Sequence, residues 1–245
     1  MPNYQLLNDK THKNLKVITG HSAQFDENIA NTLTFPTEYG DVQREYPIFF
    51  GKNPDTGEFC SIVVFGFQAG ENLFLQGEQW NASYIPAAIA RGPFLIGFQN
   101  QQENGGSPAA PVIQVDMDSP RISQTEGEAM FLADGSISPY AKKINSILSA
   151  IHQGMEASKP MFAAFLEYDL IEPVTLNIEL NSGQKINLQG NYTIHEEKLS
   201  KLSGEALEKL NKAGYLQAAF LVIASLNNIK KLIEMKNKPN DSANN

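Results

Sequence analysis

Cysteine is almost missing from this chain of 245 residues. Cys60 is the only one, so an intramolecular disulfide and a metal site built from several cysteines are both excluded. Because Cys60 lies within the apolar run 59–67, we expect it to be a buried and chemically inert thiol.

Positive charge is also in short supply. The chain has 19 Lys and Arg against 27 Asp and Glu, which gives a net charge of -8. A surface of that sign repels phosphate backbones, so we expect no nucleic-acid partner. The hydrophobic content of 42% and the charged content of 19% are typical of a globular protein with a buried core.

Long apolar segments are missing too. The longest strictly apolar run covers residues 218–224, far short of the roughly 18 residues that a membrane-spanning helix needs. The first residues show no basic stretch followed by an apolar one, so they do not resemble a secretory signal. We therefore expect a cytoplasmic protein without a membrane span.

Familiar catalytic motifs are absent from the sequence. There is no G-x-S-x-G elbow and no G-x-G-x-x-G turn, and Gly51-Lys52 lacks the remaining residues of a phosphate-binding loop. His195 and Glu197 begin like part of an iron site, but the third ligand would have to come from one of the distant histidines His12, His21 and His152. The sequence predicts no cofactor.

The first half of the chain is predicted to be rich in strands. The runs 46–50 and 59–67 flank a turn-forming Asn-Pro-Asp-Thr-Gly and indicate a hairpin. Further strands are expected at 73–75, 94–98 and 112–115, with a short helix at 36–44. Residues 99–111 are polar and rich in Gly and Pro, which predicts an exposed, mobile loop.

The second half is predicted to be mostly helical. Apolar residues from Ile144 to Met155 recur at helical spacing, which predicts a helix over 139–157. A second helix, capped by Ser158, would bury Phe162, Phe165 and Leu166. Alternating apolar residues at 174–180 and 186–188 predict a hairpin, and two or more helices follow from 197 to 233.

Together these patterns predict an α+β fold. Its sheet is mainly antiparallel and built from short strands and hairpins, and its helices are concentrated in the C-terminal half. We expect one domain over 1–236, strand-rich over 1–136 and helix-rich over 137–236. The polar stretch 237–245 is expected to be a disordered tail.

The segment 71–94 is the leading candidate for a binding site. It holds Trp80, the only tryptophan, together with Tyr84 and Arg91, and the candidate binding residues are these three and Asn72. An aromatic face beside an arginine would suit a peptide or an acidic ligand. The alternative is that Trp80 and Tyr84 are core aromatics and that Arg91 pairs with an acid, such as Glu71 or Glu78.

Four acidic residues form the densest acidic cluster in an expected loop: Asp116, Asp118, Glu126 and Glu128. Their carboxylates could bind Mg²⁺ or Ca²⁺, and Asp116 and Asp118 are the weak metal candidates. Solvated surface acids are the commoner explanation in a chain of this charge, so no metal site is expected.

Several short motifs spread over nearly the whole chain resemble the bacterial SapC family. They are the stretches 46–50, 71–75, 84–87, 91–94 and 188–190 followed by Ile194, with Trp80 and the later residues Leu202, Leu210, Gly214, Ser225-Leu226 and Leu232. Where the family usually has paired arginines and an aromatic residue before Pro-Phe, this chain has Ala90-Arg91-Gly92. A site that requires two guanidinium groups is therefore not expected to transfer intact.

The resemblance implies a link to bacterial surface layers or to TonB-dependent uptake systems. It carries over no catalytic residues. We accordingly expect a non-catalytic accessory or binding protein that binds a protein partner or a small ligand. The alternative is an unrecognised enzyme acting on a peptide or glycan through Arg91 and the acids from Asp116 to Glu128.

Overall fold

The computed structural model describes residues 3–99 and 110–238. The loop predicted at 99–111 falls almost entirely outside these ranges. The tail predicted at 237–245 also lies outside them from residue 239 onward.

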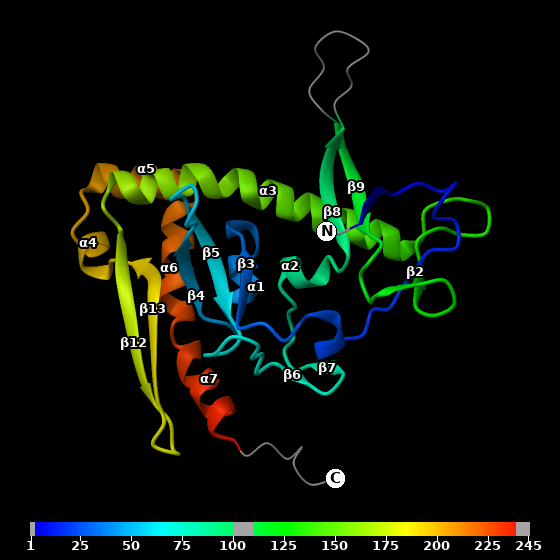
Figure 1. The fold of residues 1–245 in the computed structure, drawn as a ribbon. Helices are drawn as coiled ribbons and strands as arrows, with labels where there is room; N and C mark the ends of the chain where they lie inside the picture. Colours follow the sequence, from blue (N-terminus) through cyan, green and yellow to red (C-terminus); the bar gives the residue numbers. More distant parts are fainter. Residues whose placement is uncertain (1–2, 100–109, 239–245) are drawn as a thin grey trace.

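A five-stranded antiparallel sheet with the order β12-β13-β4-β5-β3 forms the centre of the protein (Figure 1). Its strands are β3 (Asn31–Thr34), β4 (Ile48–Lys52), β5 (Phe59–Val64), β12 (Ile171–Glu179) and β13 (Lys185–Ile194). Both predicted hairpins are present, as β4 with β5 and as β12 with β13. In the first, the Asn53 side chain accepts hydrogen bonds from the backbone of Asp55 and Thr56 and so closes the turn.

Three smaller antiparallel sheets flank the centre. Their strands are β1 (Tyr4–Leu6), β8 (Phe94–Gln99) and β9 (Ala110–Asp116); β2 (Lys16–Val17), β10 (Ile122–Ser123) and β11 (Glu128–Ala129); and β6 (Leu75–Gln76) with β7 (Gln79–Trp80). The expected strands at 94–98 and 112–115 are confirmed. The strand expected at 73–75 is displaced to β6, because Asn72 forms a turn in which its side chain accepts from the Phe74 backbone and its carbonyl accepts from the Leu75 backbone.

Most of the helical residues lie in the second half of the chain. The helices are α1 (Tyr39–Val42), α2 (Ala87–Ala90), α3 (Pro139–Glu167), α4 (Glu196–Ser200), α5 (Gly204–Lys212), α6 (Tyr215–Ser225) and α7 (Asn228–Asn237), with 3₁₀ turns η1 (Ala23–Phe25) and η2 (Pro36–Glu38). The predicted α+β class, with its antiparallel sheets and late helices, is confirmed.

The two helices predicted on either side of Ser158 are one helix, so that prediction was wrong. Helix α3 starts where expected, with the Ser138 hydroxyl accepting from the Ala141 backbone at 3.0 Å, and it continues past Pro160. Ser158 does not cap a helix; its hydroxyl donates to the carbonyl of Gly154 at 2.7 Å. Packing of the following aromatic residues on the sheet outweighs the one backbone hydrogen bond that Pro160 removes.

Two residues predicted to face the core are exposed. Met155 and Leu166 of α3 are 53% and 54% exposed, because they flank an open apolar groove of about 690 Å³ beside Leu33 of β3. Cys60 also lines this groove and is half-buried rather than buried, which corrects a second expectation. Partial burial raises the pKa of its thiol, which favours the inert form.

Helix α3 runs across the top of the molecule and contributes to two clusters of buried side chains (Figure 1). Met161 and Phe165 join the large cluster, which includes side chains of the central sheet. Ile144 and Leu148, nearer the start of the helix, join a smaller cluster with strands β2, β8 and β9. The expectation of one domain over 1–236 stays a prediction.

The C-terminal helices pack on the large cluster. Val222 of α6 and Leu232 of α7 are fully buried there. The Ser225 hydroxyl accepts a hydrogen bond from the backbone of Ile48, the first residue of β4, at 2.8 Å. The stretch Tyr215–Asn237 has a mean hydropathy of 1.2 and would be long enough to cross a membrane by length and composition alone. A core helix passes the same test, and the absence of a membrane span stays a prediction.

Candidate functional site

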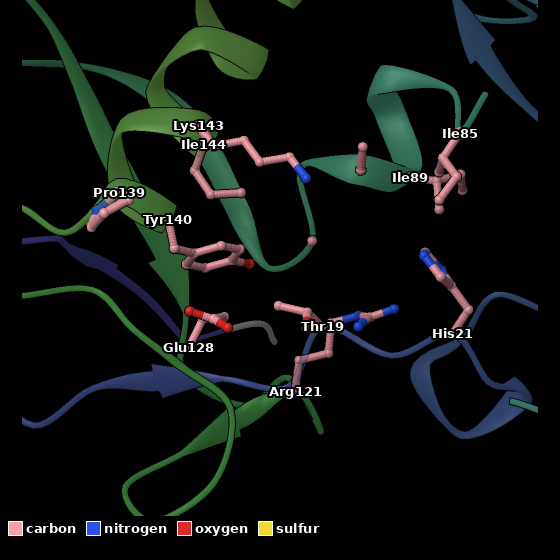
Figure 2. A pocket seen from close by; sticks show the side chains of 12 residues that line it. Thr19, His21, Ile85, Ile89, Arg121, Glu128, Pro139, Tyr140, Lys143 and Ile144 are labelled. Carbon is pink, nitrogen blue, oxygen red and sulfur yellow. The ribbon is translucent and has the colours of Figure 1, made fainter. Parts of the chain in front are cut away.

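A cavity of about 410 Å³ opens where four stretches of the chain meet, near residues 19–21, 85–92, 121–128 and 139–144 (Figure 2). These four stretches lie close together because β2 pairs with both β10 and β11 and because the first turns of α3 cover the small sheet that results. Helix α2 closes the side next to the central sheet. Cavities of this size are large enough for a small ligand.

Arg121 forms the floor of the cavity and is paired with Glu27, which does not itself line the cavity. The two residues are only 7% and 4% exposed. Arg121 also donates from Nη1 to the carbonyls of Ile18 and Gly20, each at 2.7 Å, and its guanidinium lies 4.2 Å from the centre of the Phe25 ring. These contacts hold the guanidinium in one orientation.

His21 is held by the same carboxylate. Its Nδ1 lies 3.0 and 3.1 Å from the two oxygens of Glu27, which also accept from the Ser22 backbone at 3.1 Å. The edge of the imidazole meets the Trp80 ring at a centroid distance of 5.6 Å. The ring points from the N-terminal segment toward Ile89 of α2 (Figure 2).

Three polar side chains complete the cavity from the α3 side: Tyr140, Lys143 and Glu128. Figure 2 shows the Lys143 ammonium and the Tyr140 hydroxyl directed into the open space across from Arg121. Burial raises the pKa of Tyr140 to about 12; the nearby Glu128 charge adds to the increase and the Arg121 charge opposes it. In the described part of the chain, none of these three side chains has a hydrogen-bond or ion-pair partner.

The remaining wall is apolar and comes from Ile85, Ile89 and Ile144. The N-terminus of α3 lies at the rim, where unpaired backbone N–H groups favour negative charge. The oriented Arg121 guanidinium, the exposed Lys143 ammonium, a helix N-terminus and an apolar wall can together hold an anionic group attached to an apolar body.

Trp80 is a core aromatic, as the alternative interpretation of its segment expected. It is 8% exposed, stacks among Phe65 and Phe74, and donates from Nε1 to the Tyr46 hydroxyl at 2.7 Å. A large polar groove between α7 and β6 reaches its edge. Trp80 thus supports His21 from beneath the cavity.

Asn72 and Tyr84 also have internal partners. Asn72 is buried and donates from Nδ2 to the Glu27 carbonyl at 2.8 Å, so it braces the floor of the cavity. The half-buried Tyr84 donates its hydroxyl to Glu38 at 2.7 Å. Burial, and then that carboxylate, raise its pKa.

Arg91 pairs with neither Glu71 nor Glu78, so that expectation was wrong. The chain reverses at Gly92, whose φ is +56°, and Arg91 donates from Nη1 to the Phe94 carbonyl at 2.7 Å. Partial burial lowers its pKa. Glu71 instead forms an ion pair with Lys236 of α7.

The acidic cluster does not assemble. Asp116 accepts from the Asp118 backbone at 3.1 Å, Glu126 is exposed, and only Glu128 lines the cavity. Across residues 3–99 and 110–238, no three His, Cys, Asp or Glu side chains are grouped so that they could hold a metal ion.

Sequence reasoning named His21 only as a distant histidine for an iron site and did not group it with the other residues that build the cavity: Glu27, Arg121, Tyr140 and Lys143. They come from distant parts of the chain and form no local motif. The nearest signal was the segment 71–94, which supplies Ile85 and Ile89 to the wall.

Comparison with known proteins gives one match. The family model described as SapC matches residues 7–232. No curated protein and no solved structure matches the chain.

Proposed function

The chain belongs to the SapC family, and from this premise we propose that it is a non-catalytic binding protein for a small anionic ligand held in the cavity between α2, α3 and residues 19–21. The observation that carries the proposal is the position of Lys143. Its ammonium points into the cavity and has no partner among the described residues. Arg121, whose charge is balanced by Glu27, adds N–H donors held in one orientation across the same space.

The donor capacity of Arg121 supports this proposal. A guanidinium has five N–H groups. The Ile18 and Gly20 carbonyls take two of them, and Glu27 takes a third. The remaining two, on Nε and Nη2, have no partner among the described residues and can donate to an anionic group while the contacts with Ile18, Gly20 and Glu27 persist.

The family resemblance supports a role as an accessory to surface-layer or TonB-dependent uptake systems, and the lack of a recognisable secretory signal in the sequence favours a cytoplasmic location. Ala90 and Gly92, which stand where the resemblance implies an arginine and an aromatic residue, both line the cavity. The cavity of this chain is therefore wider and less basic than one built on the usual pattern. A protein partner remains the alternative ligand, and it would bind at the groove beside Trp80 and Asn72.

An enzyme that acts on a peptide or glycan has less support. In that hypothesis Arg91 and the loop acids meet in one cleft. Arg91 is not among the residues that line the cavity, and of the acids only Glu128 is. The observation that favours an enzyme is the Glu27–His21 contact, because a carboxylate that orients an imidazole is common in catalytic sites.

Calorimetric titration with 4-methylpentanoate tests the proposal, with the uncharged 4-methylpentanamide as the matched ligand. The acid should bind and the amide should bind at least tenfold more weakly. Replacing Lys143 with methionine keeps the chain length and removes the charge, so Lys143→Met should weaken acid binding about tenfold, or about 1.4 kcal/mol. Lys142 and Lys143 are both exposed, but only Lys143 lines the cavity, so Lys142→Met is the matched control.

Two outcomes would contradict the proposal. One is equal affinity for the acid and the amide, which would mean that the charge is not recognised. The other is an equal effect of Lys143→Met and Lys142→Met, which would place binding elsewhere or make it a general effect of net charge.

A further inference from the structure

The hydrogen bonds around Glu27 fix the proton on one nitrogen of His21. The Glu27 carboxylate is buried and accepts from Arg121, from the Ser22 backbone and from His21 Nδ1. An ionised carboxylate has only acceptors, so Nδ1 must carry a hydrogen to make its contacts at 3.0 and 3.1 Å. In the neutral imidazole this leaves Nε2 as a lone-pair acceptor.

Nε2 has no partner in the part of the chain that the structure describes. The contacts with Glu27 on one side and Trp80 at the edge restrict rotation of the imidazole, so Nε2 stays directed at the cavity. His21 lines the cavity, and its ring points toward Ile89 (Figure 2). An acceptor therefore faces the same space as the Lys143 ammonium.

Glu128 places a second acceptor on the cavity wall. Its carboxylate has no ion-pair partner among the described residues. A ligand with only an anionic group would satisfy Lys143 and Arg121 but would leave Nε2 of the half-buried His21 unmatched, whereas the exposed Glu128 carboxylate can keep its water. Leaving polar groups unmatched in a partly enclosed site costs binding free energy.

We propose that the ligand carries a hydrogen-bond donor beside its anionic group, as in a 2-hydroxy or 2-amino acid with an apolar side chain. This inference rests on the proposed function. The anionic group lies between Lys143 and Arg121, the hydroxyl or ammonium donates to His21 Nε2, and the side chain packs on Ile85 and Ile89. A cavity of about 410 Å³ is large enough for such a molecule.

The test compares 2-hydroxy-4-methylpentanoate with 4-methylpentanoate, which differ only in the donor. The titrations are done by calorimetry at pH 8, where imidazole side chains are ordinarily neutral. The hydroxy acid should bind about tenfold more tightly to the unmodified protein. In His21→Phe, which keeps a ring against Trp80 but has no acceptor, the difference should vanish, and His21→Gln should restore part of it through its amide oxygen.

The outcomes separate this inference from the proposed function. Equal binding of both acids to the unmodified protein would refute the donor requirement and leave the anionic site standing. If neither acid binds, both the donor requirement and the proposed anionic site are refuted. A preference that persists in His21→Phe would remove His21 from the explanation.

A measurement without any variant guards against misfolding. Nitrogen-15 spectra of the histidine side chains distinguish the two neutral tautomers directly. A hydrogen on Nδ1 of His21 is expected, and a hydrogen on Nε2 would overturn the inference.

Discussion

Glu27 and Arg121 are 94 positions apart in the chain, yet they form a buried ion pair beneath the cavity. The pair joins the segment after β2 to the turn before β10. It also positions His21, since the same carboxylate holds the imidazole. One contact therefore links the stability of the small sheet to the geometry of the cavity.

Removing one member of this pair should be strongly destabilising. Glu27→Gln keeps the shape of the side chain but leaves the Arg121 guanidinium buried without a compensating charge. We expect a loss of about 3–5 kcal/mol in the free energy of unfolding, measured by urea denaturation. The control is Glu208→Gln, which breaks an exposed pair with Lys212 on α5 and should leave the unfolding curve nearly unchanged. Similar losses in both variants would show that the buried pair has no special role.

Replacing Gly154 with alanine, a change that normally stabilises helices, should destabilise this protein. It lies inside α3, where alanine is preferred over glycine by about 1 kcal/mol. A Cβ at this position would stand only 2.4 Å from the Phe35 Cβ, so Gly154→Ala should instead destabilise by about 1–3 kcal/mol in thermal unfolding. Gly204→Ala in α5, where the added carbon meets nothing within 4 Å, should be neutral or stabilising. A stabilised Gly154→Ala protein would contradict the close packing of α3 on η2.

Stability should fall at alkaline pH because several tyrosines are buried. Burial raises the pKa of Tyr140 to about 12, and it raises those of Tyr39, Tyr46 and Tyr84 as well. In the unfolded chain tyrosine has its ordinary pKa of 10.0. The stability that Tyr140 contributes is therefore complete below pH 10 and is lost as the pH rises from about 10 to about 12. Absorbance at 295 nm should therefore show phenolate formation that coincides with unfolding. Full ionisation of all 8 tyrosines in the folded protein would contradict their burial.

Trp80 should report on the cavity without any label. It is the only tryptophan, and it contacts His21 at a ring distance of 5.6 Å. Binding of 2-hydroxy-4-methylpentanoate beside His21 should change its emission with the same midpoint as the calorimetric titration. Unchanged emission at saturation would mean that the ligand binds away from His21.

Much of the fold could be predicted from local patterns. The hairpin of β12 and β13 follows from alternating apolar residues around Asn181-Ser182-Gly183, and the pairs Glu197–Lys201 and Glu208–Lys212 have the expected helical spacing. Helix α3 was divided wrongly because local signals at Ser158 and Pro160 do not reveal the packing that continues the helix.

The cavity could not be predicted, because it depends on contacts between distant residues. His21 and Lys143 look like isolated surface residues until β2 pairs with β10 and β11. The sequence did single out the segment 71–94, but its aromatic residues support the cavity from beneath. Trp80 and Asn72 contact His21 and Glu27 from beneath, and both also line the polar groove between α7 and β6.

The location of binding is the central claim, and backbone amide chemical shifts recorded during titration with 4-methylpentanoate test it most directly. The cavity model predicts that the largest changes fall within 19–21, 85–92, 121–128 and 139–144. The apolar groove is the competing location on the same molecule. Changes centred on Cys60, Met155 and Leu166 would contradict the model.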